Sequence, residues 1–174
     1  MRTVFLGERP PELEAFLVRR RALGQDRHDE VWEGSYHVAP PGPHPYHGVV
    51  DEELGAAVRP YAKRRGLIGC ISFNLGTPDN YRVPDRGYLQ ELGPGSFLPT
   101  ATVVVEILSP DDESYEKLPF YAAQGVQEAL VAHPTERWVH CYDLGQDPPL
   151  LVERSECLDV SMATLEAAIA WPGA

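Results

Sequence analysis

Apolar and polar residues along the chain follow two spacings, one typical of helices and one typical of strands. Apolar recurrence every three to four residues, read with cap signals, predicts helices at 10–22, from about 46 to 65, after Ser109, and at 162–171. Period-two alternation and β-branched runs predict strands at 31–39 (a hairpin turning at Gly34), 67–75, 81–85, 102–108, 128–133, 137–144 and 150–153. This order predicts an α/β fold of the α+β type, with a mixed sheet, flanking helices and an N-terminal helix plus hairpin.

Two prolines complicate the predicted helices. Pro60 should kink the second helix or divide it into two pieces. Pro119 follows a helix start predicted at Ser109–Asp112, and either it kinks that helix or it begins the regular part and leaves Lys117 just outside. The connection at 86–99 is long enough to form a functional flap.

One predicted strand carries a charged residue among apolar ones. The run Thr102–Leu108 has the composition of a strand buried on both faces, and Glu106 lies inside it. Burying a carboxylate costs several kcal/mol, in order of magnitude, unless a cation meets it. Glu106 is therefore either a metal ligand or the buried partner of Lys117 or of an arginine.

Two further residues could meet Glu106 across adjacent strands. Asp85 ends a short extended segment, and Lys117 follows Glu106 by eleven residues. Two carboxylates and a lysine brought together would form a site for a hard divalent cation. The alternative for Asp85 is a structural role in an Asx turn after Pro84.

Length and composition indicate an ordinary globular protein. We expect the 174 residues to form a single domain, 1–174, because 43% of them are hydrophobic and 24% are charged. No stretch approaches the ~20 consecutive apolar residues of a membrane span. The apolar run at the start of the sequence is too short for a signal peptide. The three widely spaced cysteines argue against a disulfide framework, so we expect a cytoplasmic setting.

The net charge of -11 argues against nucleic-acid binding, because phosphate contacts usually require basic patches. Any such role must rest on a local patch, on metal ions at the site or on a partner. The triplet Arg19–Arg21 is either such a patch or a solvated helix end.

Two residues are accessory candidates for a site. Glu33 lies at the bend of the predicted hairpin and either joins a metal site or faces solvent. His47 lies in the first turn of the long helix beside His44, but no cysteine pair stands nearby at zinc-ligand spacing.

Several stretches together resemble a known family. They are Asp29–Gly34, Phe73–Gly76, Arg82-Val83-Pro84-Asp85, Val104–Pro110, Lys117 and Phe120–Val126. Over roughly residues 10 to 155 the chain is similar to the putative restriction endonuclease family of small bacterial proteins, within the PD-(D/E)XK nuclease superfamily. The resemblance implies a restriction-endonuclease-like core. It also implies that Asp85, Glu106 and the Ile107 carbonyl hold Mg²⁺ or Mn²⁺, with Lys117 as the catalytic lysine.

The chain departs from the superfamily pattern at one position. The lysine normally stands two residues after the second acid, where this chain has Leu108. Lys117 on the following helix fits the role of a migrated lysine.

The resemblance implies a metal-dependent endonuclease that hydrolyses DNA phosphodiester bonds. Two alternatives stay open: a catalytically silent interaction module with a nuclease fold, and a metal-dependent hydrolase of a smaller substrate. We also expect a homodimer, because duplex cleavage needs two active sites and the Trp138–Tyr142 strand offers an apolar face.

Overall fold

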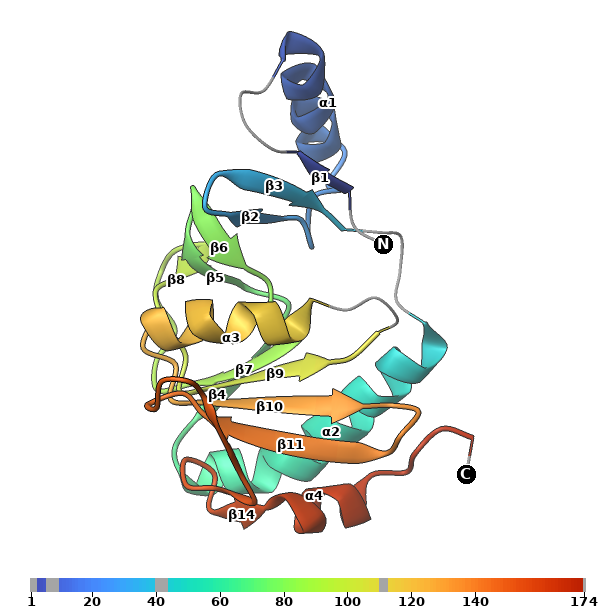
Figure 1. The fold of residues 1–174 in the computed structure, drawn as a ribbon, viewed down its shortest axis with the longest axis vertical. Helices are drawn as coiled ribbons and strands as arrows, with labels where there is room; N and C mark the ends of the chain where they lie inside the picture. The colour runs from blue at the N-terminus through green and yellow to red at the C-terminus, as the bar shows by residue number, and fades with distance from the viewer. Residues whose placement is uncertain (1–2, 6–9, 40–43, 110–112, 174) are drawn as a thin grey trace.

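A computed structural model describes residues 3–5, 10–39, 44–109 and 113–173. In the described part of the chain the helices are α1 (Pro11–Ala22), α2 (Pro45–Arg64), α3 (Ser114–Ala123) and α4 (Met162–Ala168). The strands form two six-stranded sheets and a small pair, β13 (Arg154–Ser155) with β14 (Val160–Ser161). The two larger sheets and their helices are visible in Figure 1.

The central sheet has the order β12-β11-β10-β9-β7-β4. Its strands are β12 (Leu150–Val152), β11 (Trp138–Asp143), β10 (Glu128–His133), β9 (Val103–Ile107), β7 (Arg86–Leu89) and β4 (Ile68–Ile71). β9 and β10 run parallel and the other pairs are antiparallel. The predicted mixed sheet is confirmed, as is the hairpin of β10 and β11.

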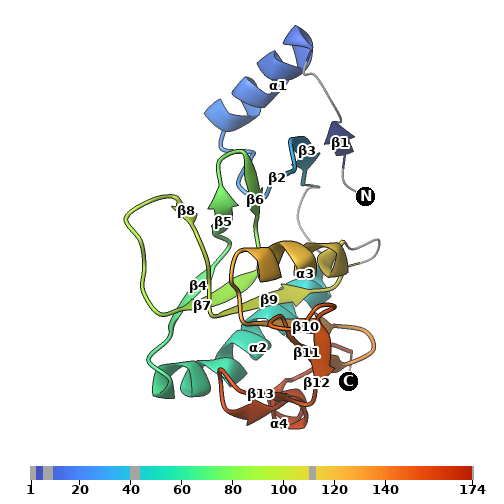
Figure 2. The same ribbon diagram turned by 60° about the vertical axis from the view of Figure 1, so that its left-hand side comes forward.

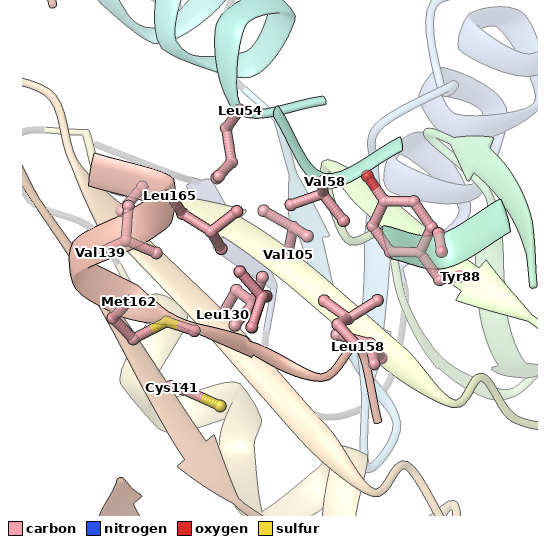
Figure 3. Packing of buried hydrophobic residues seen from close by; sticks show 14 of the residues in the cluster. Leu54, Val58, Tyr88, Val105, Leu130, Val139, Cys141, Leu158, Met162 and Leu165 are labelled. Carbon is pink, nitrogen blue, oxygen red and sulfur yellow. The ribbon is translucent and has the colours of Figure 1, made fainter. Parts of the chain in front are cut away.

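Helices cover both faces of the central sheet, α2 and α4 on one and α3 on the other (Figure 1). Leu54 and Val58 of α2 and Leu165 of α4 pack on Val105 of β9, as Figure 3 shows. On the opposite face Leu118 of α3 packs with Val104. β9 is therefore buried on both sides, as its continuous apolar run predicts.

The second sheet has the order β1-β3-β2-β6-β5-β8 and carries α1 (Figures 1 and 2). Its strands are β1 (Thr3–Phe5), β3 (Ser35–Val38), β2 (Glu30–Trp32), β6 (Asn80–Arg82), β5 (Asn74–Thr77) and β8 (Phe97–Leu98). The predicted N-terminal helix and hairpin are thus present, and the hairpin turns at Glu33 and Gly34.

The predicted single strand at 67–75 is wrong. The structure divides it into β4 and β5, which belong to different sheets. Ser72 separates them with φ 46, a left-handed conformation that interrupts an extended chain, and its N–H donates to the Asp85 carbonyl. Apolar residues on both sides of Ser72 hide this break from a pattern analysis.

The segment predicted as a flap also contains regular structure. Residues Arg86–Leu89 form β7, next to β9, and Phe97–Leu98 form β8. The predicted strand at 81–85 ends early, at Arg82, and Asp85 lies in the bend just before β7. Only the part between β7 and β8 is a loop.

The prolines interrupt neither helix. α2 continues through Pro60, whose ring is exposed while Val58 and Ala62 on either side are buried, so packing holds the helix together. α3 contains Pro119 and includes Lys117 in its first turn and a half. The start predicted at Ser109–Asp112 lies partly outside the described residues, and α3 begins at Ser114. α4 is capped by Ser161 as predicted but ends at Ala168 rather than at residue 171.

Candidate active site

Asp85 and Glu106 lie at the same end of two neighbouring central strands. Arg86 of β7 pairs with Val105 of β9, so the residue before Arg86 lies beside the residue after Val105. The Asp85 carboxylate accepts a hydrogen bond from the Ile107 N–H, with Oδ2 at 2.8 Å. This bond ties the bend before β7 to the end of β9.

Glu106 is buried against α3. It shares the α3-facing side of β9 with Val104, two residues earlier, and is 3% exposed. Lys117 Nζ lies 3.1 Å from Glu106 Oε1 and 3.3 Å from Oε2, and the Tyr121 hydroxyl donates to Oε1. Lys117 and Tyr121 are one helical turn apart, so one face of α3 supplies both partners.

Lys117 also contacts a second buried carboxylate, which sequence reasoning missed. Glu30 Oε1 lies 3.1 Å from Lys117 Nζ, and the Glu30 side chain is inaccessible to solvent. Oε1 also accepts from the Val83 N–H at 2.8 Å, and Oε2 accepts from the Trp32 indole at 2.7 Å. Glu30 stands at the start of β2, next to the acidic Asp29, and no local pattern marks it as buried.

Burial dominates the electrostatics of this cluster. It raises the pKa of the Glu106 carboxyl from 4.5 to about 7, against the charge of Lys117, which lowers it. The charges of Asp85 and Glu30 raise this pKa further, while the Tyr121 hydrogen bond lowers it. Burial also raises the pKa of Tyr121 well above its ordinary value, so its hydroxyl stays a donor. The cluster therefore holds a carboxyl group that titrates near neutrality.

The two accessory candidates are placed differently. His47 Nε2 lies 3.2 Å from Asp85 Oδ2, so the first turn of α2 does reach the site. Glu33 is bonded to Arg82 at 3.2 and 3.3 Å and to Asn80 at 3.3 Å, and its side chain is 68% exposed. In the structure Glu33 lies in the turn of the β2–β3 hairpin, and its carboxylate accepts hydrogen bonds from Arg82.

Arg82 is a buried cation to which the sequence analysis gave no role. Only 2% exposed, its guanidinium lies between the rings of Trp32, at 4.3 Å, and Phe120, at 4.0 Å. It donates to the Val31 carbonyl at 2.9 Å as well as to Glu33. Burial lowers the pKa of Arg82, and the Glu33 charge opposes that shift. Arg82 thus joins β2, β6 and α3 around the buried lysine.

The donor atoms present suit a hard cation. Asp85 and Glu106 offer carboxylate oxygens, Ile107 offers a backbone carbonyl, and Asp85 Oδ1 accepts no hydrogen bond from any described residue. Among the residues described, no group of three or more His, Cys, Asp or Glu side chains could hold a metal. One or two carboxylates with retained waters is the arrangement that Mg²⁺ commonly uses.

The described part of the chain contains no helix with the length and apolar character needed to cross a membrane.

Comparisons with known proteins agree with this architecture. None of the curated proteins matches the chain. Among solved structures, a putative nuclease belonging to DUF820 from Anabaena variabilis ATCC 29413 is similar, with a TM-score of 0.65 and 19% sequence identity. The match covers 81% of this chain and 90% of that chain, and at this identity it shows the fold. The model of the Uma2 family, described as putative restriction endonuclease, matches residues 13–170, and the chain therefore belongs to this family.

Proposed function

We propose that this protein is a metal-dependent endonuclease that hydrolyses DNA phosphodiester bonds. The family and the nuclease-like fold support a nuclease. The observation that carries the finer proposal is the meeting of Asp85, Glu106 and Lys117 at one end of β7 and β9.

Each of these residues has a role that its surroundings support. Asp85, Glu106 and the Ile107 carbonyl would hold Mg²⁺ or Mn²⁺, which when bound lowers the pKa of a water and offsets negative charge on a phosphate. Lys117 supplies a fixed positive charge that orients the attacking water or stabilises developing charge. His47 and Tyr121 fix the two carboxylates through hydrogen bonds.

The experiment that tests this proposal is incubation of supercoiled plasmid with the purified protein and Mn²⁺. We expect nicked and linear products, their loss with EDTA, and their loss in Asp85→Ala. Intact plasmid from wild-type protein at all Mn²⁺ concentrations would contradict the proposal.

One observation favours the silent module as a second candidate. Lys117 and Tyr121 already satisfy the Glu106 carboxylate, so the cluster is stable as an ion pair that needs no metal. The melting temperature separates the two functions, because a cation that binds only the folded state must raise it. A silent module would show neither cleavage nor a shift with Mn²⁺.

The raised pKa of Glu106 predicts a pH-dependent stability. Between pH 4.5 and about 7 the folded state holds a proton on Glu106 that the unfolded state has lost, so this contribution to stability is lost as the pH rises through that window. As the pH rises from 4.5 to about 7, the unfolding free energy of wild type should fall by about 3 kcal/mol relative to that of Glu106→Gln. Urea unfolding of both proteins at several pH values measures this; a constant difference between them would contradict it.

We further propose that the protein forms a homodimer through the β11–β12 edge of the central sheet. Leu150 and Leu151 of the edge strand β12 are 54% and 52% exposed. They lie next to β11, on which the Trp138 and His140 rings stack. We expect light scattering at micromolar concentration to give twice the monomer mass, and Leu150→Glu to halve it. A wild-type monomer would reject this assembly.

A further inference from the structure

A hollow of about 450 Å³ lies along the other edge of the central sheet. The C-terminal half of α2 lines one side, the edge strand β4 lines the other, and β7 completes it. Figure 2 shows α2 passing beside β4 and β7. We call this hollow the α2–β4 groove.

The charge of the α2–β4 groove is opposite to that of the whole protein. Its lining includes Arg59, Lys63 and Arg86 and no acidic residue, while the chain has a net charge of -11. Arg59 and Lys63 are exposed, lie one helical turn apart on the same face, and form no ion pair with a described residue. The groove is therefore a local cationic patch on an acidic molecule.

Arg86 fixes the end of the groove that adjoins the candidate site. Its guanidinium pairs with Asp51, with Nη2 at 2.9 Å from Oδ2, and lies across α2 at Gly55. A Cβ atom at Gly55 would stand 2.5 Å from this guanidinium, so only glycine allows the approach. Arg86 is also the residue that directly follows Asp85 in the chain.

The length of the groove matches a short run of phosphates. Ile71 of β4 pairs with Arg86, at the end near Asp85, and Ile68 pairs with Leu89 farther along. This stretch of strand is about 10 Å long, which gives room for two neighbouring phosphates of one DNA strand. Arg59 and Lys63 line that length, and Arg86, paired with Asp51, lies at one end of it.

We propose that the α2–β4 groove binds the phosphate backbone of the nucleic-acid substrate. The inference rests on the proposed nuclease function and deepens it, because it explains how an acidic protein retains a polyanion. A second copy of the chain is the other occupant that exposed Ile68 and Ile71 could suit, and the experiment below distinguishes it.

The test measures binding separately from cleavage. In the non-cleaving Asp85→Ala background, Arg59→Ala/Lys63→Ala is compared with its parent by fluorescence anisotropy of a labelled DNA duplex across a series of salt concentrations. We expect the double variant to raise Kd about tenfold and to reduce the slope of log K against log salt by about 1.8, since each lost phosphate contact removes about 0.9. The charge-conserving Arg59→Lys/Lys63→Arg should bind like the parent.

A matched control removes the same charge elsewhere. Arg27→Ala/Arg154→Ala takes two exposed arginines from outside the groove and should leave the salt slope unchanged. An unchanged Kd in the groove variant, or an equal loss in the control, overturns the inference.

The remaining outcomes separate this inference from the proposed function. If wild type cleaves plasmid but the groove variant binds duplex normally, the groove assignment alone fails. If wild type neither binds nor cleaves DNA, both fail. If the variant changes the mass measured by light scattering and leaves DNA binding intact, the groove is an interface between copies.

Discussion

Replacing Lys117 with methionine is expected to abolish plasmid cleavage and to lower the free energy of unfolding by about 3–5 kcal/mol near neutral pH. The lysine is 3% exposed and its Nζ lies 3.1 Å from an oxygen of both Glu30 and Glu106. Methionine keeps the apolar stem of the side chain and removes the ammonium group. Two buried carboxylates are then left without their shared cation.

A double variant separates the two roles of Lys117. Adding Glu30→Gln to Lys117→Met removes one uncompensated charge, so part of the lost stability should return. Cleavage should not return, because the double variant still lacks the ammonium group. Lys117→Arg should also fail to restore turnover, since a planar guanidinium does not replace a compact ammonium beside a water.

The measurements are urea unfolding and the plasmid assay on the same preparations. Lys63→Met is the stability control, because it removes the charge of an exposed lysine and should change the unfolding free energy by less than about 0.5 kcal/mol. A Lys117→Met protein that cleaves at the wild-type rate would remove Lys117 from the mechanism. Loss of cleavage with unchanged stability would show that the ion pairs contribute little to the fold.

The parts of the fold that could be predicted from sequence are those whose pattern is local. The β-branched run of β9, the amphipathic α2 and the alternation in β10 and β11 each carry enough periodicity to identify the element. The break between β4 and β5 depends on one left-handed serine, Ser72, whose neighbours are apolar on both sides. No composition signal marks such a residue.

The sequence could predict only those site residues that differ in polarity from their neighbours in the chain. Glu106 stands out because a carboxylate interrupts an apolar strand, and its position then drew attention to Lys117. Glu30 begins its strand beside another acid, so nothing local distinguishes it from a solvated residue. Its contact with Lys117 arises from tertiary packing of the second sheet against α3, which periodicity does not encode.

The same packing makes Arg82 the position where a substitution should cost most outside the candidate active site. We expect Arg82→Ala to lower the unfolding free energy by about 3–5 kcal/mol, because it opens a cavity between two rings and removes the buried hydrogen bond to the Val31 carbonyl. The guanidinium stacks on Trp32 and Phe120 at 4.3 and 4.0 Å, and desolvated contacts of this kind are worth about 2 kcal/mol.

Arg82→Lys should recover little of this stability, although it keeps the charge, since an ammonium neither stacks between two rings nor supplies the same set of donors. Because Trp32 lies on β2 beside Glu30, Arg82→Ala should also loosen the hold on Lys117 and reduce plasmid cleavage. Urea unfolding followed by tryptophan fluorescence measures the first effect, and the plasmid assay measures the second. Arg27→Ala, which removes an exposed arginine, provides the reference for both. If Arg82→Ala matched that reference in stability and in cleavage, the buried stack would not be what holds β2 and α3 around the lysine.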